Sequence, residues 1–308
     1  MPNIIDAHSH LWLRQDTEVG GKKIKSLKNG RSIFMDEEVQ MIPPFMIDGV
    51  NSAEVFLSNM DYAQVSAAVV VQEIIDGQQN DYLLDVQKRY PNRFFTMGMP
   101  DMKKLSLGEA GKETFLEETS ALLDRGFRGI AIPGHRLTES VHTLLPMCKL
   151  LEERGIILDM CLDDNARQIA EMAEVIQECP NLKVAIGHFG MVTTPTWKNQ
   201  ILLARESKNV TIESGGITWL YNSEFYPYPS AIRSIKEAAD MVGMDRLMWG
   251  SDYPRTITAI TYKMSYDFVC KSTELTDKDK ALFLGENAQR FYGFLNLVEL
   301  PYIKNMSE

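Results

Sequence analysis

Short apolar segments alternate along the chain with longer segments in which apolar residues recur at helical spacing. The apolar segments are rich in isoleucine, valine and phenylalanine, and their nearly continuous apolar character is typical of parallel strands covered on both faces. Eight segments are predicted to be strands: Asn3–His8, Ser66–Gln72, Phe94–Met99, Phe127–Pro133, Ile156–Leu162, Leu182–His188, Val210–Ser214 and Arg246–Asp252.

The segments between these strands carry the signals of helix ends. Asn51–Glu54 precedes an apolar stripe and is expected to cap a helix. Gly126 and Gly155 are expected to end two others, because glycine is favoured just past the last helical residue. Including the two that end at Gly126 and Gly155, the helices predicted after the first are Tyr82–Tyr90, Glu109–Arg125, Thr138–Arg154, Asn165–Glu178, Ser230–Val242, Ile260–Ser272 and Asp277–Phe291.

Eight strands that alternate with helices predict an α/β fold with a parallel sheet. The number eight favours a closed (β/α)8 TIM barrel over an open doubly wound sheet. An open sheet would more often carry a glycine-rich turn after its first strand, where this chain has His8-Ser9-His10. Because such a barrel occupies about 250 residues, the chain is expected to form one domain, 1–308, with room for an insertion.

Residues 14–50 interrupt the alternation of strands and helices, because this segment is far longer than a usual loop between a strand and a helix. We expect a long inserted loop after the first strand, on the catalytic face of the barrel. Five basic residues lie in it without an acidic residue among them: Lys22, Lys23, Lys25, Lys28 and Arg31. Two interpretations stay open, namely a lid that attracts an anionic substrate and a loop whose charges only face water.

Composition narrows the possible partners. The 32 basic and 42 acidic residues give a net charge of −10, which disfavours nucleic acid because phosphate binding needs a basic surface. No apolar run of about 18 residues occurs, so a membrane span is not expected. The four cysteines are far apart and the first residues do not resemble a signal peptide, so a cytoplasmic location is expected.

Histidines gather at the ends of the predicted strands. His8 and His10 are separated by one residue, so both rings point to the same side of a strand. His135 and His188 also fall at or just after strand ends, whereas His142 falls in a predicted helix and is interpreted as structural. Because (β/α)8 barrels build their active sites from the carboxyl ends of the strands, this pattern predicts a site at the barrel mouth.

Charged residues follow the same strand ends. Asp252 leaves the eighth apolar strand, and a buried carboxylate is costly unless it is paired or bound to a metal. We interpret Asp252 as catalytic, with a helix cap as the alternative, and His188 as catalytic, with a core histidine as the alternative. Arg136, Arg255 and His135 could bind a substrate carboxylate, although surface salt bridges would explain the two arginines equally well.

Three motifs in this order resemble the amidohydrolase superfamily: Asp6-Ala-His8-Ser-His10, Gly187-His188-Phe-Gly190 and Gly250-Ser-Asp252-Tyr-Pro254. More narrowly, they are similar to its amidohydrolase-related branch, and the similarity runs to Asn287–Phe291. That branch holds metal-dependent decarboxylases of aromatic and unsaturated acids, such as aminocarboxymuconate semialdehyde decarboxylase. It also holds lactonases of sugar acids and pyrone dicarboxylates. The resemblance implies a barrel enzyme and leaves the substrate open.

The fifth strand departs from the decarboxylase pattern. The decarboxylases usually place a metal-binding histidine there, whereas Cys161 takes that place here, with Asp159 on the same side. A thiolate can bind zinc, but a buried cysteine more often only packs. The stretch around this strand looks more like the lactonases, several of which work without metal. One divalent metal, zinc or manganese, held by His8, His10 and Asp252 therefore stays open beside metal-independent activity.

Three hypotheses follow. The first is a hydrolase that opens a lactone of a small sugar acid or dicarboxylic acid, with Asp252 accepting a proton from water and His8, His10 and His188 stabilising the carbonyl oxygen. The second is a metal-dependent non-oxidative decarboxylase, a lyase, with His188 as proton donor. The third is a non-catalytic barrel, which the motifs disfavour. The expected partners are a small anionic substrate and a second copy of the chain, forming a homodimer.

Overall fold

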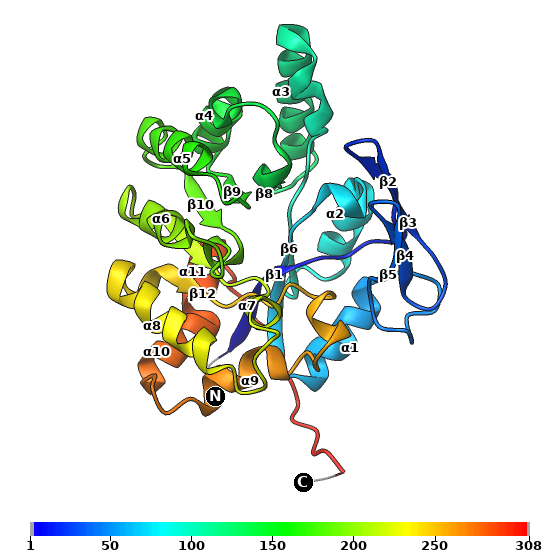
Figure 1. Cartoon of the computed structure of the whole chain (residues 1–308), viewed down its shortest axis with the longest axis vertical. Coiled ribbons are helices and arrows are strands. Elements are labelled where there is room, and N and C mark those ends of the chain that lie inside the picture. The colour runs from blue at the N-terminus through cyan, green and yellow to red at the C-terminus, as the bar shows by residue number, and fades with distance from the viewer. Residues whose placement is uncertain (1–2, 307–308) are drawn as a thin grey trace.

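The computed structural model describes residues 3–306, so the two residues at each end of the predicted domain lie outside the description (Figure 1). All eight predicted strands are confirmed, and all their pairings with one another are parallel. One sheet has the order β1 (Ile4–Ser9), β6 (Val65–Val70) and β7 (Phe94–Thr96). The other has the order β12 (Leu247–Met248), β11 (Val210–Glu213), β10 (Lys183–Ile186), β9 (Ile157–Met160) and β8 (Gly129–Ile132).

Backbone hydrogen bonds join the two sheets at both of their edges. At the first seam, Ala7 N donates to the Trp249 carbonyl at 2.8 Å and Asp252 N donates to the His8 carbonyl at 2.9 Å. At the second, Gly98 N donates to the Gly129 carbonyl at 3.0 Å. These contacts are consistent with the TIM barrel of the sequence prediction. They also place His8 and Asp252, which are 244 residues apart in sequence, side by side.

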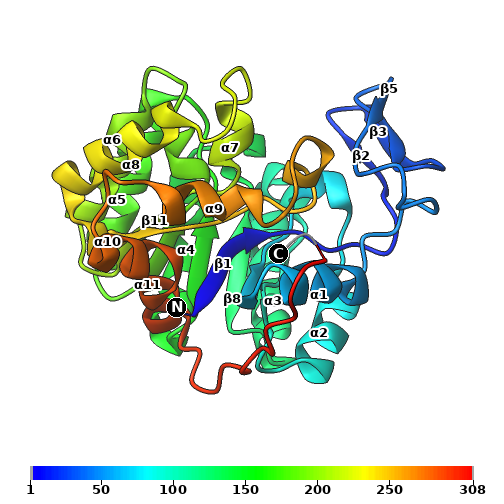
Figure 2. The same ribbon diagram turned by 90° about the horizontal axis from the view of Figure 1, so that it is seen from below.

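The helices lie outside the strands (Figures 1 and 2). They are α1 (Ala53–Tyr62), α2 (Asn80–Arg89), α3 (Gly108–Asp124), α4 (Leu145–Arg154), α5 (Ala166–Glu178), α6 (Trp197–Leu202), α7 (Ile217–Leu220), α8 (Pro229–Val242), α9 (Met264–Lys271), α10 (Asp277–Ala281) and α11 (Asn287–Tyr292). The predicted caps are confirmed, since the Ser52 side chain accepts from Val55 N and Gly155 ends α4 with φ 66°. The short helices α6 and α7 were not predicted. No helix within residues 3–306 is long and apolar enough to span a membrane.

The helix predicted over Asp277–Phe291 is divided by a wider π-helical turn, Leu282–Glu286, between α10 and α11. A Cβ on Gly285 would overlap the carbonyl oxygen of Asn3, so the turn lies directly against the start of β1. Phe283 also accepts a hydrogen bond from Trp249 N at 2.8 Å. The helix therefore widens where two backbones meet, as π-turns do when tertiary contacts compete with the helical ladder.

Residues 14–50 contain a small antiparallel sheet and are not an irregular loop. Its strands are β2 (Asp16–Val19), β3 (Lys22–Ser26), β4 (Arg31–Phe34) and β5 (Glu37–Gln40), paired in that order. Gly20 and Gly21 both have positive φ, as do Met35 and Asp36, which is the geometry of two-residue hairpin turns. The strands are short and mostly exposed, so no hydrophobic pattern revealed them. Figure 2 shows this sheet standing at one side of the barrel.

Candidate active site

A cavity of 340 Å³ opens at the carboxyl ends of the barrel strands. All seven predicted site residues line it: His8, His10, His135, Arg136, His188, Asp252 and Arg255. His142, which we interpreted as structural, does not line this cavity and is paired with Glu174 at 2.8 Å near the surface. The structure thus brings together residues from β1 and from the segments that follow β8, β10 and β12.

Two histidines and a carboxylate converge at the bottom of the cavity. The Nε2 atoms of His8 and His10 are 3.2 Å apart. Asp252 Oδ1 lies 3.2 Å from the Nε2 of His10 and 3.8 Å from that of His8. Their ligand atoms form one of the groups that could hold a metal ion.

Two further carboxylates lie behind the histidines. Glu213 Oε1 lies 2.9 Å from Nδ1 of His8, and Asp76 Oδ2 lies 3.1 Å from Nδ1 of His10. A carboxylate at this distance favours a proton on Nδ1, which leaves both Nε2 lone pairs facing each other and Asp252. Carboxylates orient metal-binding histidines in this way.

This donor set fits a divalent metal. Three electron-pair donors so close together repel one another unless a cation lies among them. Zinc bonds of about 2.0–2.2 Å in tetrahedral geometry would place ligand atoms roughly 3.3 Å apart. Two of the observed spacings are 3.2 Å, and the third, from Asp252 to His8, is 3.8 Å. His8, His10 and Asp252 would therefore hold the ion.

Protons satisfy the same cluster when no metal is bound. Burial alone would lower the pKa of His8, but the charge of Glu213 raises it to about 9. Burial likewise opposes the charged form of His10, whereas Asp252 and Asp76 raise the pKa of His10 well above its usual value. Burial would raise the pKa of Asp252, but the three histidines hold it well below its usual range. The Asp252 carboxylate is consequently ionised at neutral pH.

Glu213 also fixes the position of His188. One carboxylate oxygen accepts from His188 N at 2.9 Å and the other accepts from Gly215 N. The Nδ1 of His188 lies 2.9 Å from the Gly215 carbonyl, which can only accept, so the neutral ring carries its proton there. Burial and the neighbouring charge of His8 lower the pKa of His188. Its Nε2 is therefore an acceptor at neutral pH.

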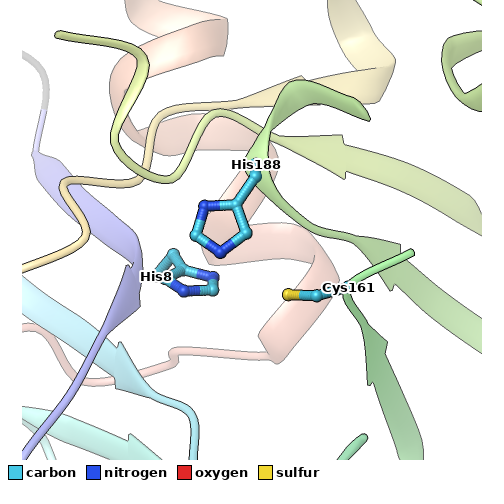
Figure 3. Close-up of side chains that lie close together, drawn as sticks. All are labelled: His8, Cys161 and His188. Atoms are coloured by element: carbon cyan, nitrogen blue, oxygen red, sulfur yellow. The ribbon is translucent and has the colours of Figure 1, made fainter. Parts of the chain in front are cut away.

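Cys161 occupies the place on the fifth strand where the resemblance led us to look for a histidine. Figure 3 shows its sulfur directed towards His8, with the His188 ring above them. The ligand atoms of these three residues lie within 4.8 Å of one another. Burial, and then the carboxylate of Asp159, raises the pKa of the Cys161 thiol well above its usual value. A Cβ on Gly187 would overlap the sulfur, so this glycine makes room for it.

The predicted substrate-binding residues differ in what they contact. Arg136 is paired with Glu73, with Nε 3.2 Å from Oε1, and His135 lies 3.9 Å from the same oxygen. Arg255 stacks on the Trp219 ring, with Cζ 3.7 Å from the ring centroid. An ion pair was the alternative for both arginines, and the structure shows one for Arg136.

Three carboxylates of the site were not predicted from the sequence: Glu73, Asp76 and Glu213. Glu73 and Asp76 follow the predicted strand Ser66–Gln72, and Glu213 lies at the end of Val210–Ser214. Each is a carboxylate at a strand end, the same signal that revealed Asp252. Trp219 also belongs to the site, since its Nε1 donates to Asp252 Oδ2 at 2.6 Å.

The inserted sheet contributes apolar side chains to the cavity. Phe34, Val39 and Met41 line it, together with Gln40. The basic residues of this segment are exposed and, within the described residues, are not part of the lining. The structure therefore gives no support to a lysine-rich lid.

Comparison with known proteins identifies the family. The model of the amidohydrolase family matches residues 5–294. The chain belongs to the amidohydrolase family. A search of curated proteins finds no match.

Solved structures share the fold of this amidohydrolase at low sequence identity. A probable 2-pyrone-4,6-dicarboxylic acid hydrolase from Acinetobacter baumannii, with citric acid bound, is 19% identical, with 95% of this chain and 100% of that chain covered and a TM-score of 0.68. An amidohydrolase from Burkholderia multivorans with bound zinc is 16% identical, with 94% and 99% covered and a TM-score of 0.68. A 5-carboxyvanillate decarboxylase from Novosphingobium aromaticivorans, complexed with manganese, is 16% identical, with 78% and 80% covered and a TM-score of 0.53.

These neighbours include a hydrolase and a decarboxylase, and they hold zinc in one case and manganese in another. At this level of identity they show that the fold is shared, whereas the family assignment rests on the match over residues 5–294. The reaction itself differs among them.

Proposed function

We propose that this amidohydrolase opens a lactone of a small acid by hydrolysis, with Asp252 accepting the proton of water. The observation that carries the proposal is the setting of this carboxylate. It is buried, and both of its oxygens are fixed, one by Trp219 and one beside His10. A base held this firmly against the cavity can direct one water towards a bound carbonyl.

The neighbouring residues have separate roles in the proposed reaction. The water oxygen attacks the lactone carbonyl carbon while its proton passes to Asp252 Oδ1. The neutral His188 accepts a hydrogen bond from the same water through Nε2, which is a different role from the oxyanion stabilisation predicted for it. His8 and His10, when protonated, present positive charge to the carbonyl oxygen. The ring C–O bond then breaks, and the leaving alkoxide takes the proton from Asp252.

A metal fits the same site. A divalent ion held by His8, His10 and Asp252 would polarise the carbonyl oxygen as a Lewis acid. His135, Arg136 and Arg255 are proposed to form the substrate-binding side of the cavity.

The proposal is tested with a panel of five- and six-membered lactones of sugar acids and carboxylic acids. Opening one ring at neutral pH releases one proton, so base consumption in a pH-stat measures turnover directly. We expect at least one lactone to be hydrolysed above its spontaneous rate without release of carbon dioxide. Carbon dioxide released from aromatic hydroxy acids, with no lactone opened, would contradict the proposal and favour the decarboxylase.

A further inference from the structure

Arg255 is a cation at the cavity without a protein partner for its guanidinium. Within residues 3–306 this group forms no ion pair or hydrogen bond, and its Cζ lies over the Trp219 ring, 3.7 Å from the ring centroid. Stacking on an indole orients a guanidinium while leaving its edge donors open. The exposed donors of Arg255 are thus held in place for a ligand at the cavity.

The same tryptophan connects Arg255 to the reacting group. The ring that carries the guanidinium donates from Nε1 to Asp252 at 2.6 Å. A carboxylate bound by Arg255 would therefore lie close to the carbonyl that faces Asp252.

The other arginine of the cavity is already neutralised. Both carboxylate oxygens of Glu73 contact Arg136, at 3.2 Å and 3.4 Å. A second substrate carboxylate at Arg136 would compete with Glu73 and meet its negative charge. The cavity therefore offers one free guanidinium among the described residues.

The inserted segment, residues 14–50, supplies an apolar wall formed by Phe34, Val39 and Met41. These side chains are half-buried and line the cavity, although they belong to a segment whose lysines face solvent. Buried Trp12 lines the cavity as well. Apolar side chains left half-exposed in a cavity favour an apolar ligand group, because its binding removes both surfaces from water.

We propose that the substrate carries a single carboxylate, which Arg255 binds, and an apolar ring or chain, which packs against Phe34, Val39 and Met41. This inference names the substrate class for the proposed lactone hydrolysis. It sets the chain apart from a preference for dicarboxylic acids, because the second arginine is held by Glu73.

Calorimetric titration with three non-reactive probes tests this inference. 3-Phenylpropionate has one carboxylate and an apolar ring, glutarate has two carboxylates, and 3-phenylpropanol has the ring without a charge. We expect 3-phenylpropionate to bind at least about tenfold more tightly than the other two. Equal or tighter binding of glutarate, or no binding of 3-phenylpropionate, would overturn the inference.

Variants test which residue binds the carboxylate of the ligand and which one contacts its ring. Arg255→Met should weaken 3-phenylpropionate binding about tenfold or more and leave 3-phenylpropanol unaffected. Phe34→Ser should weaken both ring-bearing probes. Arg154→Met, which removes an exposed arginine paired with Asp124, serves as the matched control. Unchanged affinity in Arg255→Met, with folding verified by circular dichroism, would also overturn the inference.

Binding separates this inference from the proposed function. The Asp252→Asn variant should still bind 3-phenylpropionate, since Arg255 is intact. If the probe binds as expected but no lactone is hydrolysed, the proposed reaction fails and the assignment of the substrate class stands. If lactones are hydrolysed but the probe does not bind, the proposed reaction stands and the assignment of the substrate class fails.

Discussion

At the scale of single residues, the site is a set of histidines whose protonation is decided by neighbouring carboxylates. Glu213 and Asp76 favour Nδ1 protons on His8 and His10, so both Nε2 atoms face Asp252. Both carboxylates are far in sequence from the histidine that each one contacts. The pairing exists because β1, β6 and β11 end at the same face of the barrel.

Glu213→Gln should weaken metal binding. The amide cannot hold the Nδ1 proton of His8 as a carboxylate does, and loss of such a partner typically costs about 10–100-fold in metal affinity. Zinc titration of chelator-treated protein measures the effect. Glu113→Gln, on an exposed position of α3, is the control and should bind zinc as the unaltered protein does. If Glu213→Gln bound zinc as tightly as the unaltered protein, the role assigned to Glu213 in metal binding would be contradicted.

His135 should give a distinctive pH dependence. Burial, followed by the charge of Arg136, lowers its pKa to about 4, although Glu73 partly opposes this. The unfolded chain binds a proton at the ordinary pKa of about 6.5, so acid favours the unfolded state. The contribution of His135 to stability is therefore complete above pH 6.5 and is lost as the pH falls towards 4. His135→Gln should reduce the loss of stability between pH 6.5 and 4, measured by urea unfolding, and an unchanged pH profile would contradict this.

At the scale of elements, one buried aspartate holds the first and last strands together. Asp6 on β1 accepts from Ser251 N at 2.8 Å, from the Ser251 hydroxyl, from Tyr262 at 2.7 Å and from His8 N at 3.1 Å. Burial raises its pKa to about 6 even though these hydrogen bonds oppose the shift. The contacts tie β1 to the segment that carries Asp252.

Asp6→Ala should destabilise the fold by about 2–4 kcal/mol, because it leaves several buried donors without an acceptor. Urea unfolding at neutral pH measures this change. Asp240→Ala, on an exposed position of α8, is the control and should stay within about 0.5 kcal/mol of the original stability. A loss in Asp6→Ala no larger than that of the control would contradict the role assigned to the seam.

The sequence predicted the buried elements better than the exposed ones. The eight strands are apolar because both of their faces are covered, so their pattern was visible. The small sheet within residues 14–50 has mostly exposed strands and was predicted as a loop, although Gly20-Gly21 marked one hairpin turn. The division around Gly285 could not be predicted, because it depends on a contact with Asn3.

At the scale of the whole molecule, the barrel gathers distant residues into one cavity. The predicted site residues meet there because they all lie at or just after strand ends, a rule that needs only the order of the elements. The sequence could not show that Arg136 is paired with Glu73 or that Arg255 lies over Trp219, because these partners come from other segments of the chain. The net charge of −10 likewise did not indicate that the cavity presents a free guanidinium.

The most direct test of the account is the turnover of Asp252→Asn on a lactone that the unaltered enzyme opens. The amide keeps the size of the side chain but cannot accept the proton of water. We expect kcat to fall by about 10²–10⁴-fold, with 3-phenylpropionate affinity retained. A variant that hydrolyses the lactone at the original rate would contradict the central role of Asp252.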